Sequence, residues 1–165
     1  MNPSPTFEDQ LTALLPRLRR FAHALSRNSA DADDLTQAAI ERALRSKSQW
    51  QPGTRLDSWM YRIIRNLWID TARGRARKEK FEAPPEEAER VGEDPRDGMH
   101  ASLDLKRAMV AMQRLPEEQR EIVALILVEG FGYREVSEML ELPIGTVSSR
   151  LVRGRTALLA MVGEQ

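Results

Sequence analysis

The segment YREVSEMLELPIGTVSSRLVRGRTALLAM, residues 133–161, decides the fold of the C-terminal part of this 165-residue chain. Its apolar residues are spaced as in two short helices that pack against each other across a tight turn. The residues with this spacing are Val136, Leu140, Leu142, Val147 and Leu151. Ser137 is small where the two helices would cross, and Pro143 is tolerated at the start of the second helix. We therefore predict a helix-turn-helix.

The second helix of this motif has the composition of a helix that enters the major groove of DNA. From Pro143 to Ala160 there are three arginines and no acidic residue. Small hydroxyl side chains allow close approach to DNA, and arginines bind phosphates or guanine. The side chains off the apolar stripe are Thr146, Ser148, Ser149, Val152 and Arg153, with Arg150 and Arg155 beside them. A generic helical hairpin has the same apolar spacing, but the lack of acids favours DNA binding.

Composition and charge exclude several classes of protein. Because 41% of the residues are apolar and the net charge is zero, disorder throughout the chain is not expected. No stretch long enough to span a membrane is free of charge, and the first ten residues lack the features of a secretory signal. We therefore expect a cytoplasmic protein without membrane insertion. Cysteine is absent and there are only two histidines, so neither a disulfide nor an ordinary zinc site is expected.

A helix predicted from Leu56 to about Ala76 has two different faces. At about 100° per residue, the apolar residues of the expected core stripe fall within about 100° of each other. They are Leu56, Trp59, Met60, Ile63 and Leu67. A second face gathers arginines and an amide, which suit phosphates and base edges. It consists of Arg62, Arg65, Asn66, Ile69 and Arg73. Trp50 and Trp68 lie near these arginines and would either stack on single-stranded bases or belong to the core.

The other predicted elements are also helical, because helical spacing dominates and alternation typical of strands is absent. One run extends from Phe7 to Leu25, and Pro16 is expected to begin a second segment or to kink the helix. Another starts near Ser29, a candidate cap with acids in the first turn, and continues to Leu44. The apolar run IVALILV, residues 122–128, predicts a central helix. The chain is therefore predicted to be all-α.

The uneven distribution of charge predicts two small domains. Residues 53–80 carry a net charge of +5, whereas residues 81–104 carry −6. The acidic stretch is rich in proline and glycine and has few large apolar residues, so it cannot offset the entropy of ordering. We predict an N-terminal helical domain at 1–80, a flexible acidic linker at 81–101 and a C-terminal helix-turn-helix domain at 102–165. The basic stretches on either side would each meet a polyanion.

Three segments together resemble one protein family. They are ADADDLTQAAIERAL (30–44), WQPGTRLDSWMYRIIRNLWIDTARGR (50–75) and LPEEQREIVALILVEGFGYREVSEMLELPIGTVSSRLVRGR (115–155). In this order and spacing they resemble an extracytoplasmic-function (ECF) sigma factor, a two-domain specificity subunit of bacterial RNA polymerase. The resemblance covers nearly the whole chain except the linker and the termini. Ser148 and Ala38 depart from the family, where a basic residue and a glutamate are common.

The resemblance implies three sets of site residues. The set that would bind the coiled coil of the largest subunit of core RNA polymerase is Asp33, Asp34, Gln37 and Arg42. The set that would bind the opened −10 promoter element, with a flipped base held by the loop 47–54, is Trp50, Thr54, Arg62, Arg65, Asn66 and Arg73. The set that would read the −35 element as duplex is Tyr133, Arg134, Thr146, Ser148, Ser149, Arg150, Val152 and Arg153.

The sequence does not predict an enzyme. No catalytic triad or phosphate-binding loop is recognisable, so we expect no catalytic residue, cofactor, metal or small-molecule substrate. The expected partners are core RNA polymerase, promoter DNA and an anti-sigma factor that holds the protein inactive until a stress signal. The alternatives are a stand-alone helix-turn-helix repressor or activator, a helical scaffold, and a sigma-like mimic that binds only an anti-sigma regulator.

Overall fold

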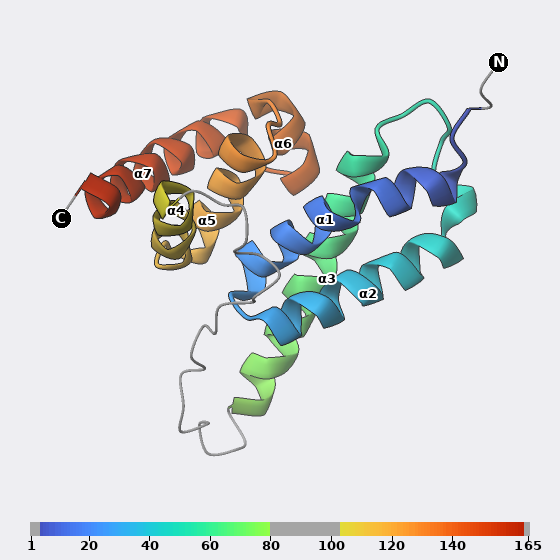
Figure 1. The fold of residues 1–165 in the computed structure, drawn as a ribbon, viewed down its shortest axis with the longest axis horizontal. Helices are drawn as coiled ribbons and strands as arrows, with labels where there is room; N and C mark the ends of the chain where they lie inside the picture. Colours follow the sequence, from blue (N-terminus) through green and yellow to red (C-terminus); the bar gives the residue numbers. More distant parts are fainter. Residues whose placement is uncertain (1–3, 80–102, 164–165) are drawn as a thin grey trace. The chain divides into compact units, whose positions relative to one another are not determined.

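The computed structural model describes residues 4–79 and 103–163, and every regular element in these two ranges is a helix. The predicted all-α class is therefore confirmed. The chain divides into two compact units, Met1–Arg90 and Val91–Gln165, whose helices are labelled in Figure 1. The predicted acidic linker, residues 81–101, lies outside the described residues, and the domain limits remain a prediction.

The N-terminal unit contains α1 (Phe7–Ser26), α2 (Ser29–Arg45), the short 3-10 turn η1 (Lys47–Gln49) and α3 (Leu56–Glu79). A capping box begins α1, because the Thr6 hydroxyl accepts from the Asp9 backbone N–H and the Asp9 carboxylate accepts from the Thr6 N–H. Pro16 lies inside α1, so a second segment starting there was a wrong expectation. Asn28, and not Ser29, caps α2 through its side chain.

Each of the three long helices in this unit packs against the other two. On α2 the side facing its neighbours is formed mainly by small residues, which lets the helices approach closely; the buried ones include Ala32, Ala39 and Ala43. Leu44, predicted to belong to the apolar face of this helix, is 47% exposed instead. The preceding residue, Ala43, is fully buried, and Leu44 lies about 100° away from it around the helix.

The buried stripe of α3 differs from the predicted one. Its fully covered residues are Leu56, Met60, Tyr61 and Ile64, whereas Trp59, Ile63 and Leu67 are only half-buried. The centre of the buried stripe therefore lies roughly 70° around the helix axis from the centre of the predicted stripe. The cause is that α3 packs against α1 and α2 together, and that Tyr61 is a core residue whose ring meets the Phe21 ring edge-on at a centroid distance of 4.8 Å.

The C-terminal unit contains α4 (Leu103–Gln113), α5 (Glu117–Val123), η2 (Ala124–Val128), α6 (Tyr133–Leu140) and α7 (Ile144–Gly163). The predicted helix-turn-helix is formed by α6 and α7. Glu141 turns the chain in a left-handed conformation with φ of 55°. The Ser137 hydroxyl donates to the Leu142 carbonyl at 2.5 Å, and the Leu142 N–H returns a bond to the Ser137 carbonyl. Ser137 thus closes the turn as well as being small.

The apolar run 122–128 is central only in its first half. Ile122, Val123, Ala124 and Leu125 are buried, but Leu127 and Val128 are exposed, so the prediction of a central helix holds only for the first part of the run. The change coincides with η2, where the Glu129 N–H bonds to the Ala124 carbonyl five residues back, as in a π-helix. Leu127 and Val128 are the last two residues of this wider turn.

Gly154 lies buried where α7 meets α5. A Cβ atom at this position would lie 2.8 Å from Cγ2 of Val123 and 3.3 Å from Cβ of Gln119. Val123 is itself buried and branched, so it cannot turn aside without disturbing the core. The close crossing of these two helices therefore depends on the missing side chain.

Gly154→Ala is expected to destabilise the C-terminal unit by about 1 kcal/mol, since overpacking outweighs the gain in helix propensity. Amide hydrogen exchange along α7 measures this change. Gly145→Ala in the same helix is the matched control, because nothing lies within 4 Å of the added atom. That variant should be neutral or slightly stabilised. Equal hydrogen-exchange protection of α7 in the two variants would show that the close crossing does not contribute to stability.

Candidate functional site

The first half of α7 presents polar, cationic and apolar side chains together. Val152 is 59% exposed and Arg153 is exposed, on the side of the helix away from the buried Val147 and Leu151. The predicted residues Thr146, Ser148, Ser149 and Arg150 are half-buried. On α6, Tyr133 and Arg134 are exposed. The helix-turn-helix therefore brings all eight predicted −35 residues onto two adjoining helices.

Two arginines of this surface are held by neighbouring groups. Arg153 donates to the Ser149 hydroxyl at 3.3 Å, and that hydroxyl donates to the Thr146 carbonyl. Arg150 lies 3.8 Å from the Glu118 carboxylate of α5, a distance of weak ion pairing. Such contacts reduce the side-chain entropy that an arginine would lose on binding a phosphate or a base.

The cationic face predicted on α3 is present. Arg62, Asn66 and Arg73 are exposed along the helix, and Arg65 and Ile69 are half-buried. The first three therefore lie within reach of a strand that follows the helix. Arginine forks and an amide in this spacing can bind successive phosphates and a base edge.

The loop before α3 is attached to the first turn of α1. The ring centroids of Trp50 and Phe7 are 5.5 Å apart, and those of Trp59 and Phe7 are 6.2 Å apart. Lys47 forms a 2.7 Å ion pair with Glu8 and also lies over the Phe7 ring. Two alternatives were predicted for Trp50, stacking on bases or packing in the core. In this structure the ring is half-buried against Phe7, which favours packing.

The tip of the same loop is exposed. The Thr54 hydroxyl donates to the Gln51 carbonyl at 2.6 Å and its N–H bonds to the same oxygen. Gly53 between them has φ of +90°, a conformation that a side chain would strain. The loop thus has a hydrogen-bonded turn with residues 51–55 exposed, and Trp50 beside it packs against Phe7.

Asp57 connects the loop, α1 and α3. Its carboxylate accepts from Arg55 at 2.9 Å, from the Ser58 backbone N–H at 2.8 Å and from Arg17 at 3.3 Å. Burial raises the pKa of Asp57, but the hydrogen bonds from Arg55 and Ser58 and the charges of Arg55 and Arg17 together lower it below its usual value. The ionised carboxylate is therefore the form that the fold stabilises.

Asp57→Asn is expected to lower the free energy of unfolding of the N-terminal unit by about 1 kcal/mol at pH 7. Because the folded pKa is below the unfolded value of about 4, this stabilisation is complete above that pH and is lost as the pH falls through the folded pKa. Urea unfolding followed by tryptophan fluorescence measures this unit alone, since Trp50, Trp59 and Trp68 all belong to it. A gap between variant and wild type that stays constant into acid would contradict the assignment.

The exposed face of α2 carries the residues expected to bind polymerase. Asp34, Gln37 and Arg42 are exposed; at about 100° per residue, Gln37 lies about 60° from Asp34 around the helix and Arg42 about 80° from it in the other direction. Asp33 is also exposed and lies about 40° from Gln37 around the helix, and it accepts from Arg19 of α1 at 2.6 Å. All four predicted residues are therefore exposed on α2, and Asp33 differs from the others in being paired with Arg19 of α1.

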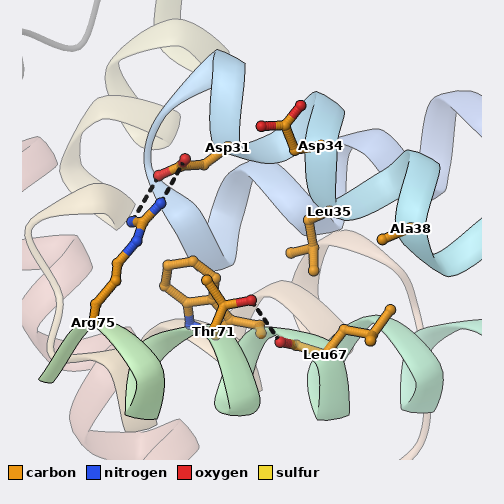
Figure 2. Close-up of a pocket in the computed structure, with 8 residues that line it drawn as sticks. Asp31, Asp34, Leu35, Ala38, Leu67, Thr71 and Arg75 are labelled. Carbon is orange, nitrogen blue, oxygen red and sulfur yellow. Dashed lines mark hydrogen bonds and ion pairs between the residues drawn. The ribbon is translucent and has the colours of Figure 1, made fainter. Parts of the chain in front are cut away.

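An open groove of about 240 Å³ lies between α2 and α3, beside this face. Figure 2 shows Asp31 of α2 and Arg75 of α3 joined across one end, with bonds of 2.7 and 2.9 Å. Leu35 and Ala38 of α2 line it opposite Leu67 of α3. Trp68 of α3 also lines the groove. Asp34 lies at the edge, and among the described residues it has no ion pair. An apolar groove with one uncompensated carboxylate suits the stem and head of a long basic side chain.

Several residues of these surfaces were not predicted. Ile144 is 51% exposed in the first turn of α7, beside the predicted −35 residues, and an isoleucine at the start of a helix without acids was the available signal. The Arg75–Asp31 pair joins residues 44 positions apart, so no local pattern could indicate it. No group of metal-ligating side chains occurs within 4–79 and 103–163, and no helix there is long and apolar enough to cross a membrane.

Comparisons with known proteins agree with this arrangement. The family model of Sigma-70 region 2 matches residues 11–78, and that of Sigma-70 region 4 matches residues 105–158. The chain is 35% identical, over 95% of its length and 85% of the relative's, to the ECF RNA polymerase sigma factor EcfG of Rhodopseudomonas palustris. It is 39% identical to the ECF RNA polymerase sigma factor SigE of Mycolicibacterium smegmatis, over 93% of this chain and 60% of that one.

Among solved structures, the chain is similar to the sigma factor RpoE of Bartonella quintana, crystallised in complex with the anti-sigma factor NepR. The TM-score is 0.86 and the sequence identity 31%, over 96% of this chain and 98% of the other. Region 2 thus matches the unit with the cationic α3 face, and region 4 matches the unit with the helix-turn-helix.

Proposed function

The chain belongs to the ECF sigma factors of RNA polymerase, and on that premise we propose that it binds core RNA polymerase, recognises the −35 and −10 promoter elements and opens the DNA for initiation. The observation that carries the proposal is that two separate units each present a cationic helix surface of different design. The surface of α7 suits a duplex, and the surface of α3 with its loop suits a single strand.

The C-terminal surface would read the −35 element. α7 would enter the major groove with Thr146, Ser148, Ser149, Val152 and Arg153, while Tyr133 and Arg134 of α6 would contact the backbone. Exposed Val152 can meet a thymine methyl group, and Arg153 can bind guanine or phosphate.

The N-terminal surface would hold the opened −10 element. Arg62, Arg65 and Arg73 would bind phosphates of the single strand, and Asn66 would meet a base edge. The loop with Trp50 and Thr54 would hold a base that has left the stack. Removing a base from the stack costs a few kcal/mol, and contacts made only to the open strand must offset this cost.

Catalysis of RNA synthesis would belong entirely to the polymerase, so we assign this chain no catalytic residue and no cofactor. Its place of action would be the cytoplasm, where polymerase and DNA are. Because the Bartonella relative was solved with an anti-sigma factor, we propose that a protein of that class also holds this chain inactive until a stress signal.

Run-off transcription tests the proposed function. The purified chain is added to core RNA polymerase on fragments of the source genome, and the 5′ ends of the transcripts are sequenced. The proposal predicts transcripts whose start sites share two upstream elements, and tight duplex binding only with core present. Tight duplex binding by the chain alone, without transcripts from core, would indicate a repressor or activator instead.

Arg153→Ala is expected to lower transcription from such a promoter about tenfold, as the loss of one guanine or phosphate contact implies. Arg107→Ala, at an exposed arginine of α4, is the matched control and should leave transcription unchanged. The defect should disappear on a template whose −35 element is scrambled, since neither protein can then use it. Equal transcription by Arg153→Ala and wild type on the intact promoter would remove this residue from the −35 surface.

A further inference from the structure

The amino-terminal turn of α1 holds the loop that precedes α3. Phe7 is 6% exposed, and its ring is the common neighbour of Trp50 from the loop and Trp59 from α3. No residue of α1 was expected to take part in promoter recognition. The aromatic cluster formed by Phe7, Trp50 and Trp59 is therefore a structural connection between α1 and the single-strand surface.

A second contact reinforces the same connection. Glu8 accepts from Lys47 at 2.7 Å, and Lys47 lies 5.6 Å from the centroid of the Phe7 ring. The hydrogen bond from Lys47 lowers the pKa of Glu8. The loop is thus held at its first residue by charge and at Trp50 by ring packing, while residues 51–55 stay exposed.

Little else fixes Trp50 in the described structure. Its indole nitrogen is covered but has no hydrogen-bond partner among the described residues, so ring packing and not a polar contact sets its orientation. The backbone around it is held by short-range bonds, from Trp50 N–H to the Lys47 carbonyl and from Thr54 N–H to the Gln51 carbonyl. The loop keeps its own turn but has one aromatic contact, that of Trp50 with Phe7. When this contact is removed, the whole loop can move while its turn stays intact.

We propose that Phe7 is a positioning residue for −10 recognition, acting through Trp50, and that Glu8 assists it through Lys47. This inference rests on the proposed function and adds a residue that determines promoter selectivity from outside the DNA surface. A base pocket discriminates only if its walls keep their places, because a displacement of about 1 Å weakens bonds to the correct base more than to a wrong one.

The test measures discrimination and not only activity. Holoenzyme made with the full chain is given a promoter found by run-off transcription and the same promoter with the flipped −10 base replaced. The ratio of the two opening rates is the readout. Loss of stability lowers the active fraction equally on both templates and leaves this ratio unchanged, whereas a misplaced loop lowers the ratio.

Phe7→Leu keeps an apolar side chain but removes the ring, and is expected to reduce the ratio about five- to tenfold. Phe21→Leu is the matched control, because Phe21 is a buried phenylalanine of the same helix that packs on Tyr61, away from the loop. It should destabilise the unit yet keep the wild-type ratio. Glu8→Gln, at an exposed position that cannot disturb the core, should lower the ratio about twofold.

The outcomes separate this inference from the proposed function. If wild-type holoenzyme opens the promoter and Phe7→Leu keeps the wild-type ratio, the positioning role is overturned and the proposed function stands. If Phe21→Leu lowers the ratio as much as Phe7→Leu does, the effect is not specific to the contact between Phe7 and the loop, and the inference also fails. If Phe7→Leu does not fold, Glu8→Gln decides by the same ratio. Failure of wild type to open any promoter would refute both.

Discussion

Replacing Asp34 by lysine is expected to lower the affinity of the chain for core RNA polymerase by about 100-fold. Of the three aspartates in the first turns of α2, Asp31 is paired with Arg75 and Asp33 with Arg19. Asp34 therefore supplies the charge that a basic side chain of a partner would meet. Reversing it turns an attraction into a repulsion, and a change of roughly 3 kcal/mol corresponds to the expected factor.

Fluorescence anisotropy of labelled chain titrated with core enzyme measures this affinity without DNA. Asp70→Lys, at an exposed aspartate of α3, makes the same charge change away from the α2 face and should bind as wild type does. The gap between Asp34→Lys and wild type should narrow as salt is raised, because the lost contact is electrostatic. Undiminished binding by Asp34→Lys would mean that polymerase docks elsewhere.

Arg120→Ala is expected to destabilise the C-terminal unit by about 2–4 kcal/mol, enough to unfold much of a unit this small. Arg120 is only 3% exposed and donates to the Leu115 carbonyl at 2.8 Å, between α4 and α5. The substitution leaves that carbonyl without its donor and opens a space in the core. The helix-turn-helix packs on the same core and would lose its support.

Amide hydrogen exchange along α5 and α7 measures the loss, while tryptophan fluorescence should show the N-terminal unit unchanged. Arg114→Ala is the matched control, since Arg114 is an exposed arginine six positions earlier. Core binding through α2 should survive Arg120→Ala, whereas transcription that depends on the −35 element should be lost. Normal protection of α7 in the variant would show that the buried guanidinium is dispensable.

Local patterns in the sequence predicted the helices well. The turn between α6 and α7, the absence of strands in the described ranges and the cationic side of α3 all follow from spacing and residue type. Each depends on residues that are close in sequence, where helical geometry fixes which side chains share a face. The exposed positions of Val152, Arg153, Arg62 and Asn66 were predictable for that reason.

Contacts between distant residues were not predictable in the same way. Tyr61 has the composition of a half-polar residue, and its place in the core becomes clear only when the ring of Phe21, 40 positions earlier, is placed against it. The burial of Arg120, an arginine expected at the surface, likewise depends on how the C-terminal unit packs. Asp33 and Asp34 are adjacent acids, yet only the packing of α1 shows that Arg19 engages the first. The attachment of the loop to Phe7 likewise joins residues more than 40 positions apart.

Permanganate footprinting of a promoter in complex with core enzyme and this chain tests the central claim most directly. The account predicts reactive, unpaired thymines in the −10 element and protection of the −35 element as duplex, both only when chain and core are present together. If the −10 thymines stayed unreactive in a complex that protects the −35 element, the chain would bind promoters without opening them, and the account would be wrong.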